Sequence, residues 1–258
     1  MTAAAVGLET VEAEAVADAF GPDAQRAGGV VCALRADIDE IYINRVLGLG
    51  VAAPATDGEL DWIADTYGSV RHTVAVAPCA QPDVAAMLRD RGYEPGYAWV
   101  KFQRSAAVPF EPASDLRAER IGSERSEQYV AVLAAGFGLV PEAAAMLGWL
   151  PGRPGWGCYL AYAGDLPVAG AAVFIHGEHA WLGQAATLPE HRRRGGQSVL
   201  MAARIAEARA GGAAVIVTET GEHADGRPAH SYRNLLRAGF EPAYVRPNYV
   251  SPIGDAVA

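Results

Sequence analysis

A short turn of three arginines and two glycines constrains this chain more than any other feature. It lies in "PEHRRRGGQSVL", between the strand-like run "HAWLGQAATL" and the helix-like run "GQSVLMAARIAEARA". The first turn of a helix exposes unpaired backbone N–H groups and carries a partial positive charge. Gly195 and Gly196 leave room for close approach, and the neighbouring arginines can pair with phosphate oxygens. The strand–turn–helix order therefore predicts a diphosphate site rather than a solvated basic corner.

The turn does not fit the common nucleotide-binding loops. A triphosphate loop needs Gly-x4-Gly-Lys-Ser/Thr, and the only lysine of the chain is Lys101. A dinucleotide fold needs Gly-x-Gly-x-x-Gly after its first strand, which is also missing. A net charge of −9 argues against nonspecific binding of nucleic acid, which requires many cations.

Composition and cysteine usage set the expected compartment. No apolar run reaches the ~18 residues that a membrane helix needs, and the first residues show no basic leader. The three cysteines, Cys32, Cys79 and Cys158, are widely spaced and fit neither a disulfide framework nor a zinc site, so no metal is expected. We expect a cytoplasmic protein without a membrane partner, and the excess of arginine and alanine points to a GC-rich bacterial genome.

Two segments of the chain resemble each other. "RGYEPGY" (91–97) and "AGFEPAY" (238–244) share glycine, Glu-Pro and tyrosine at one offset, and a strand-like run follows each. Chance similarity of a common turn is the alternative to an internal duplication, which we prefer. The linker-like stretch 105–115 would separate a domain of residues 1–108 from one of residues 109–258.

The second half predicts a mixed α/β fold. Its expected order is α-α-β-β-β-α-β-α-β, with antiparallel hairpins first and a strand–helix–strand crossover later. On the helix after the turn, Gln197, Arg204 and Glu207 share one narrow face. Val199, Ala202, Ile205 and Ala206 lie opposite and are expected to pack on the sheet.

The stretch "ATLPEHRRRGGQSVLMAARIAEA" resembles the coenzyme A signature of the GNAT acyltransferases, Arg/Gln-x-x-Gly-x-Gly/Ala. "SYRNLLRAGF" is similar to a later helix of that family, and the resemblance covers roughly residues 115–250. It implies a GNAT-like mixed sheet flanked by helices, in two tandem copies of which the first is degenerate, and acetyl-CoA or another acyl-CoA as cofactor. Backbone groups of Ala186, Thr187 and Leu188 would bind its pantetheine arm. The implied cofactor contacts also include Arg192, Arg193, Arg194, Gly195, Gly196, Gln197, Ser198 and Asn234.

The chain departs from the family pattern at three positions. Gln197 stands where the signature ends in glycine or alanine, so its side chain must turn away from the phosphate. Pro228 replaces a frequent asparagine, and Leu235 replaces the tyrosine that protonates the leaving thiolate. Tyr232, on nearly the same helix face, is the substitute general acid, although packing under the helix explains it as well. Glu219 is the preferred carboxylate for binding a cationic acceptor or taking its proton, and a solvated loop charge is the alternative.

The leading hypothesis is an N-acetyltransferase that moves an acetyl or short acyl group to an amine of a small molecule. The amine would attack the thioester directly, with the Leu188 amide polarising its carbonyl. A non-catalytic acyl-CoA sensor and a protein or peptide N-acetyltransferase are the alternatives. In the first half, "APCAQPDV" lacks adjacent glycines and cations, so we expect no coenzyme A there. Both a monomer and a homodimer are compatible with a tandem chain.

Overall fold

The computed structural model describes residues 3–222 and 230–252, so the expectation for Pro228 lies outside the described residues. The chain forms two compact units. One consists of the residues up to Lys101 together with those from Tyr244 onward, and the other of Phe102–Ala243. This division differs from the expected boundary after residue 108, because the last strand of the chain belongs to the first unit.

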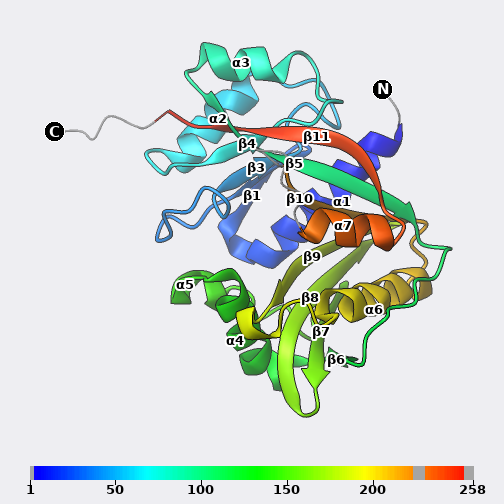
Figure 1. The fold of residues 1–258 in the computed structure, drawn as a ribbon. Helices are drawn as coiled ribbons and strands as arrows, with labels where there is room; N and C mark the ends of the chain where they lie inside the picture. Colours follow the sequence, from blue (N-terminus) through cyan, green and yellow to red (C-terminus); the bar gives the residue numbers. More distant parts are fainter. Residues whose placement is uncertain (1–2, 223–229, 253–258) are drawn as a thin grey trace. The chain divides into compact units, whose positions relative to one another are not determined.

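The first unit is built around a mixed sheet (Figure 1). Its strands follow the order β1-β2-β3-β4-β11-β5. β3 and β4 run parallel, with helix α2 between them, and β11 pairs antiparallel with β4 through Asn248 and Ala75. The elements are α1 (Ala3–Phe20), η1 (Gly21–Asp23), β1 (Ala24–Ala27), β2 (Val30–Ala33), β3 (Arg45–Leu47), α2 (Asp57–Tyr67), β4 (Thr73–Ala75), α3 (Val84–Asp90), β5 (Glu94–Ser105) and β11 (Glu241–Val250).

The second unit is a mixed sheet in the order β6-β7-β8-β9-β10, followed by the end of β5. β6 to β9 are antiparallel, and the crossover through α6 makes β10 parallel to β9. The elements are β6 (Arg117–Ile121), η2 (Ser123–Arg125), α4 (Ser126–Phe137), α5 (Pro141–Ala145), β7 (Trp156–Ala163), β8 (Leu166–His176), β9 (His179–Thr187), η3 (Pro189–His191), α6 (Gly196–Ala210), β10 (Val215–Gly221) and α7 (His230–Arg237).

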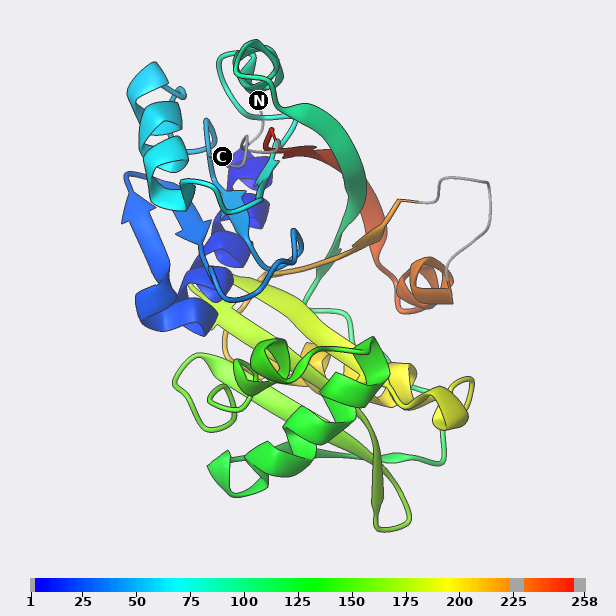
Figure 2. The same ribbon diagram turned by 90° about the vertical axis from the view of Figure 1, so that its left-hand side faces the viewer.

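Helices cover both faces of this second sheet. Leu133 of α4 lies against Gly170 of β8, whereas Glu207 of α6 lies against Gly157 of β7, on the opposite face. In Figure 2, α4 and α5, drawn in green, lie in front of the strands. The predicted mixed α/β fold is therefore confirmed. The expected element order missed only β6, an edge strand whose residues are mostly polar.

The structure corrects the expected orientation of α6. Its buried residues include Leu200, Met201, Arg204 and Ile205, whereas Ala206 is exposed. Arg204 was expected on the polar face, yet it is 2 % exposed and points at the sheet. The helix is therefore rotated relative to the expectation, and its buried face includes a cation.

The hydrophobic core of the first unit surrounds α2 and includes Leu60, Ile63, Val74 and Leu88. All three cysteines are buried and free. In residues 3–222 and 230–252, no helix combines the length and the apolar character that a membrane span requires.

Candidate functional site

The candidate site of the second unit lies where two parallel strands separate. β10 pairs with β9 through Val215, Ile216 and Val217, and the last pair is Val217 with Trp181. One residue further, the Thr218 hydroxyl donates to the Leu182 carbonyl at 2.8 Å, so a side chain replaces the ladder. β9 continues to Thr187 without pairing to β10, and its edge there is open for a ligand.

A β-bulge in β9 sets which groups face this opening. Ala172 of β8 pairs with Gly183, and Gly170 pairs with Ala186, so one β8 residue faces two residues of β9. Gln184, inside the bulge, has a φ of 52°. The extra residue reverses the alternation of side chains beyond it. Thr187 consequently faces Gly196 of α6, and Ala186 faces Gly136 of α4.

Backbone polarity at the end of β9 follows from its pairing with β8. The Leu188 N–H donates to the Val168 carbonyl at 2.9 Å, on the β8 side. In an antiparallel ladder this makes Ala169 and Thr187 a non-hydrogen-bonded pair, so Thr187 directs its N–H and C=O toward the open edge. The expected role of the Leu188 amide as an oxyanion donor does not fit this geometry. The Thr187 amide is the group that faces the opening.

The arginine–glycine turn leaves the start of α6 uncapped. Its first helical bond runs from Val199 N–H to the Gly195 carbonyl at 3.0 Å, and no side chain caps this end. The N–H groups of Gly196, Gln197 and Ser198 therefore have no carbonyl partner inside the helix. Gly195 has a φ of 84°, and a Cβ there would lie 2.5 Å from the Ser114 Oγ, so glycine is required.

The three arginines of the turn are exposed, but they are not equivalent. Arg192 donates to the Gly136 carbonyl at 3.2 Å, which links the turn to the end of α4. Arg194 approaches the His191 Nδ1 at 3.3 Å, and Arg193 has a left-handed φ of 63°. The Gln197 side chain turns back onto β9 and donates to the Thr187 hydroxyl at 3.1 Å, away from the α6 end, as expected.

The expected catalytic side chains lie on neighbouring elements. Glu219 is half-buried and lies two residues beyond the last β9–β10 pair. By strand alternation it shares the face of Trp181, opposite α6. The Tyr232 ring packs edge-to-face on Phe102 at 4.9 Å between ring centres, which favours packing under α7, and its role as an acid stays a prediction.

Two further positions of α7 were singled out in the sequence. Asn234, an expected cofactor contact, accepts from Arg237 at 3.3 Å on its own helix. Leu235, which stands in place of the family's tyrosine, is buried. Nothing in these contacts directs either side chain at the open edge of β9.

Sequence reasoning missed Arg204, whose guanidinium lies under the bulge. It donates to the carbonyls of Ala172 and Gly183 at 3.2 and 3.3 Å, and to Leu200 of its own helix at 3.1 Å. Burial lowers the pKa of Arg204 to about 10, so it remains a cation at neutral pH. A cation in the expected polar face was the only trace of this role in the sequence.

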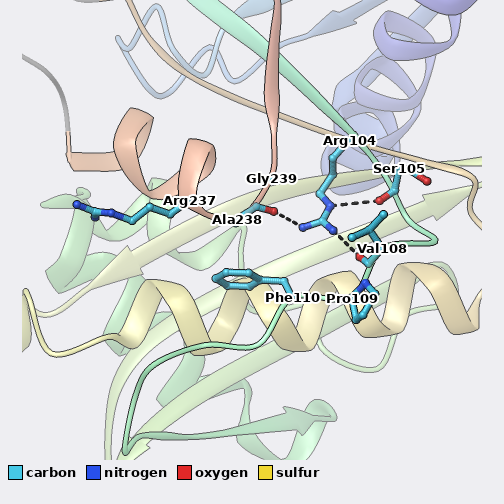
Figure 3. A pocket seen from close by; sticks show the side chains of 8 residues that line it. All are labelled: Arg104, Ser105, Val108, Pro109, Phe110, Arg237, Ala238 and Gly239. Carbon is cyan, nitrogen blue, oxygen red and sulfur yellow. Dashed lines mark hydrogen bonds between the residues drawn. The ribbon is translucent and has the colours of Figure 1, made fainter.

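A separate cavity of 210 Å³ lies at the C-terminal end of α7 (Figure 3). Arg104 lines it and donates to the carbonyls of Ser105, Ala238 and Val108. Figure 3 shows Arg237 pointing away from this guanidinium. Because the contacts of Arg104 are the carbonyls that end a helix and a loop, this arginine serves as a cap.

Residues 123–236 match the model of the acetyltransferase (GNAT) family. The resemblance to the GNAT acyltransferases is thereby confirmed, and with it the enzyme class of N-acetyltransferases. No curated protein matches the chain.

Solved structures extend the likeness in fold to the whole chain. A GCN5-related N-acetyltransferase from Kribbella flavida is 22% identical, with 98% of this chain and 97% of that chain covered and a TM-score of 0.67. One from Sphaerobacter thermophilus is 15% identical, covering 96% and 90%, with a TM-score of 0.63. A tandem GNAT protein from the clavulanic acid biosynthesis pathway is 18% identical, covering 97% and 94%, with a TM-score of 0.60.

Proposed function

We propose that this chain transfers an acetyl or other short acyl group from acyl-CoA to an amine of a small molecule. The observation that carries the proposal is the uncapped start of α6 beside the open edge of β9. The first feature suits a diphosphate and the second suits an extended amide-containing arm. Their adjacency matches a ligand that contains both groups, as coenzyme A does.

The start of α6 would hold the diphosphate. The N–H groups of Gly196, Gln197 and Ser198 point out of the helix end, and the helix dipole favours negative charge there. Arg193 and Arg194 add two exposed cations. Gln197 leaves this end free because its side chain is bonded to Thr187.

The open edge of β9 would hold the pantetheine arm and the reacting carbonyl. Thr187 offers one N–H and one C=O to that edge, so it can pair with an amide as a neighbouring strand does. The thioester supplies the acyl group that the acceptor amine attacks. A fixed N–H donor at this edge would polarise its carbonyl, an effect that typically contributes 10²–10³ in rate.

Glu219 is the proposed acceptor-side carboxylate. It lies in the part of β10 that has separated from β9, on the face opposite α6. A diphosphate at the α6 end and an amine near Glu219 would then approach the thioester from opposite faces. Deprotonating a lysine-like amine of pKa ~10.4 at pH 7 costs roughly 4–5 kcal/mol, so a carboxylate that takes this proton has a clear chemical role.

The test is calorimetric titration of the protein with acetyl-CoA, repeated on Ser198→Asp and on Ser198→Asn. An aspartate in the first turn is favourable for the helix itself but repels a diphosphate. We expect the original chain to bind one equivalent, and Ser198→Asp to bind at least about 100-fold more weakly. Ser198→Asn, whose side chain has the shape of aspartate without its charge, should bind near-normally.

Release of free thiol with a panel of amines then tests turnover. Turnover that requires an amine supports the transferase. Binding without turnover for any amine would instead support an acyl-CoA sensor. If both Ser198 variants bind acetyl-CoA equally well, the diphosphate does not bind at the α6 end.

A further inference from the structure

We infer that Arg204 is a positioning residue that holds β9 in its bulged form and thereby aims Thr187 at the open edge. The inference rests on the proposed function for its kinetic consequence. Its structural part stands on the contacts of one buried side chain.

Arg204 donates to two main-chain carbonyls at the last β8–β9 pair before the bulge. One guanidinium nitrogen donates both to Ala172 of β8 and to Gly183 of β9, the pair at which the regular ladder stops. The side chain is 2 % exposed, so water does not reach these carbonyls, and losing the arginine would cost free energy. A third bond, from Nε to the Leu200 carbonyl, fixes the side chain to α6.

The neighbouring groups are arranged around the same bulge. The Trp181 indole lies over Gly183, where a Cβ would come within 2.0 Å of the ring. On the other side, Thr218 satisfies the Leu182 carbonyl. The carbonyls of Leu182 and Gly183, where β9 leaves the regular sheet, therefore both accept from side chains.

The bulge decides the face of every later residue of β9. Without the bulge, regular alternation along the same sequence would place Thr187 on the α4 face instead of the α6 face. The Gln197–Thr187 bond and the direction of the Thr187 N–H both depend on this reversal. Arg204 therefore links α6, which carries the diphosphate end, to the strand segment that would hold the thioester.

Arg104 provides a matched control in the same unit. It is also a buried arginine whose guanidinium donates to main-chain carbonyls, at the cavity beside the end of α7. Replacing either arginine by methionine removes one buried cation and its carbonyl contacts. Only Arg204 touches the bulge, so a general loss of stability and a specific loss of positioning can be separated.

The experiment compares Arg204→Met and Arg204→Lys with Arg104→Met in steady-state kinetics. We expect Arg204→Met to lower kcat about 100-fold and to raise KM for acetyl-CoA, because a misplaced donor no longer meets the carbonyl. Binding of the nucleotide portion of coenzyme A without its pantetheine arm should stay unchanged, since the α6 end is intact. Arg204→Lys should recover part of kcat, and Arg104→Met should leave both constants unchanged.

A spectroscopic readout makes the structural part independent of turnover. In protein labelled with fluorotryptophan, the ¹⁹F resonance of Trp181, assigned through Trp181→Phe, should shift in Arg204→Met and stay in place in Arg104→Met. If the original chain neither binds nor turns over acetyl-CoA, the proposed function fails, and this resonance still decides the role of Arg204. The inference is overturned if the two methionine variants have equal kinetics and an equal Trp181 resonance. It is also overturned if Arg204→Met loses the nucleotide portion as strongly as acetyl-CoA.

Discussion

The two units use charge in opposite ways, and the difference is clearest at their strand–helix–strand crossovers. In the first unit, α2 connects the parallel strands β3 and β4, and in the second, α6 connects β9 and β10. α2 starts with a capping box in which Thr56 and Glu59 satisfy each other's backbone N–H groups. α6 starts at Gly195 with no side-chain cap. The same supersecondary unit therefore starts its helix with a side-chain cap in one case and without one in the other.

Other helix ends and charge clusters of the two units show a similar contrast. In the first unit, Asp83 caps α3, the helix after "APCAQPDV". Glu9 and Glu12 of α1 are buried against Lys101 and Arg246. In the second unit, the three arginines of the turn are exposed at the open helix end. The first unit uses its charges to close and fix its structure, which supports our proposal that it is a degenerate copy without a coenzyme A site.

The largest expected effect tests the buried charges of the first unit. Arg246 donates to Glu9 at 2.7 Å and to Glu12 at 2.5 and 3.1 Å, with all three side chains at most 2 % exposed. Arg246→Met leaves two buried carboxylates under-compensated and should lower the free energy of unfolding by about 3–5 kcal/mol. Hydrogen exchange should locate the loss in the first unit. Arg26→Met, which breaks an exposed pair with Glu14, should cost less than about 1 kcal/mol. Equal losses in both variants would contradict the prediction.

The next effect depends on pH and on a buried histidine of the first unit. His72 Nδ1 lies 2.9 Å from the Val70 carbonyl, and Nε2 lies 2.8 Å from the Tyr93 hydroxyl. Burial lowers the pKa of His72 to about 4, whereas the pKa of the same imidazole in the unfolded chain is near 6.5. The unfolded state therefore binds more protons between these values, and stability should fall by about 3 kcal/mol as pH drops from 6.5 to 4.

Urea unfolding at several pH values measures this slope. His72→Phe keeps a ring to stack on Tyr67 but cannot take a proton, so its slope in this window should be much smaller. The buried Glu9 and Glu12, whose pKa values their cationic partners hold below the usual range, lose their contribution only at lower pH. A slope that is the same with and without His72 would assign the acid sensitivity to other groups.

These contrasts show which features a sequence can reveal. The arginine–glycine turn, its flanking strand and helix, and the strand β10 were all predicted, because local patterns encode them. The role of the buried Arg204 was not predicted, because its partners are main-chain carbonyls beside a bulge, and no side-chain pattern marks the bulge. The direction of the Leu188 N–H likewise depends on strand register. The assignment of the last strand to the first unit is a long-range pairing, which no local pattern contains.

Opening the closed helix end is a smaller change that tests the comparison directly. Thr56→Ala combined with Glu59→Ala removes the capping box of α2 and should lower the free energy of unfolding by about 1–2 kcal/mol. No second equivalent of acetyl-CoA should bind in calorimetry, because Arg91 beside this helix is already paired with Asp57 and Asp61, and the carboxylate of Asp57 in the first turn repels a diphosphate. Binding of a second equivalent would mean that the cap alone prevents the first unit from binding coenzyme A.

The smallest expected effect concerns the exposed cations of the turn. Arg193→Gln should weaken acetyl-CoA binding by about 1 kcal/mol or less, roughly fivefold, because exposed ion pairs are screened by water. Arg209→Gln, at the other end of α6, is the control and should leave the affinity unchanged. Titrations at low and high salt separate the contributions of side chain and backbone to the binding free energy. The arginine contribution should fade with added salt, while the N–H groups at the helix end keep theirs. An Arg193 effect that persists at high salt would mean that the guanidinium is shielded in the complex. Arg193 would then be shielded from water in the complex, as the charged groups buried in the first unit are.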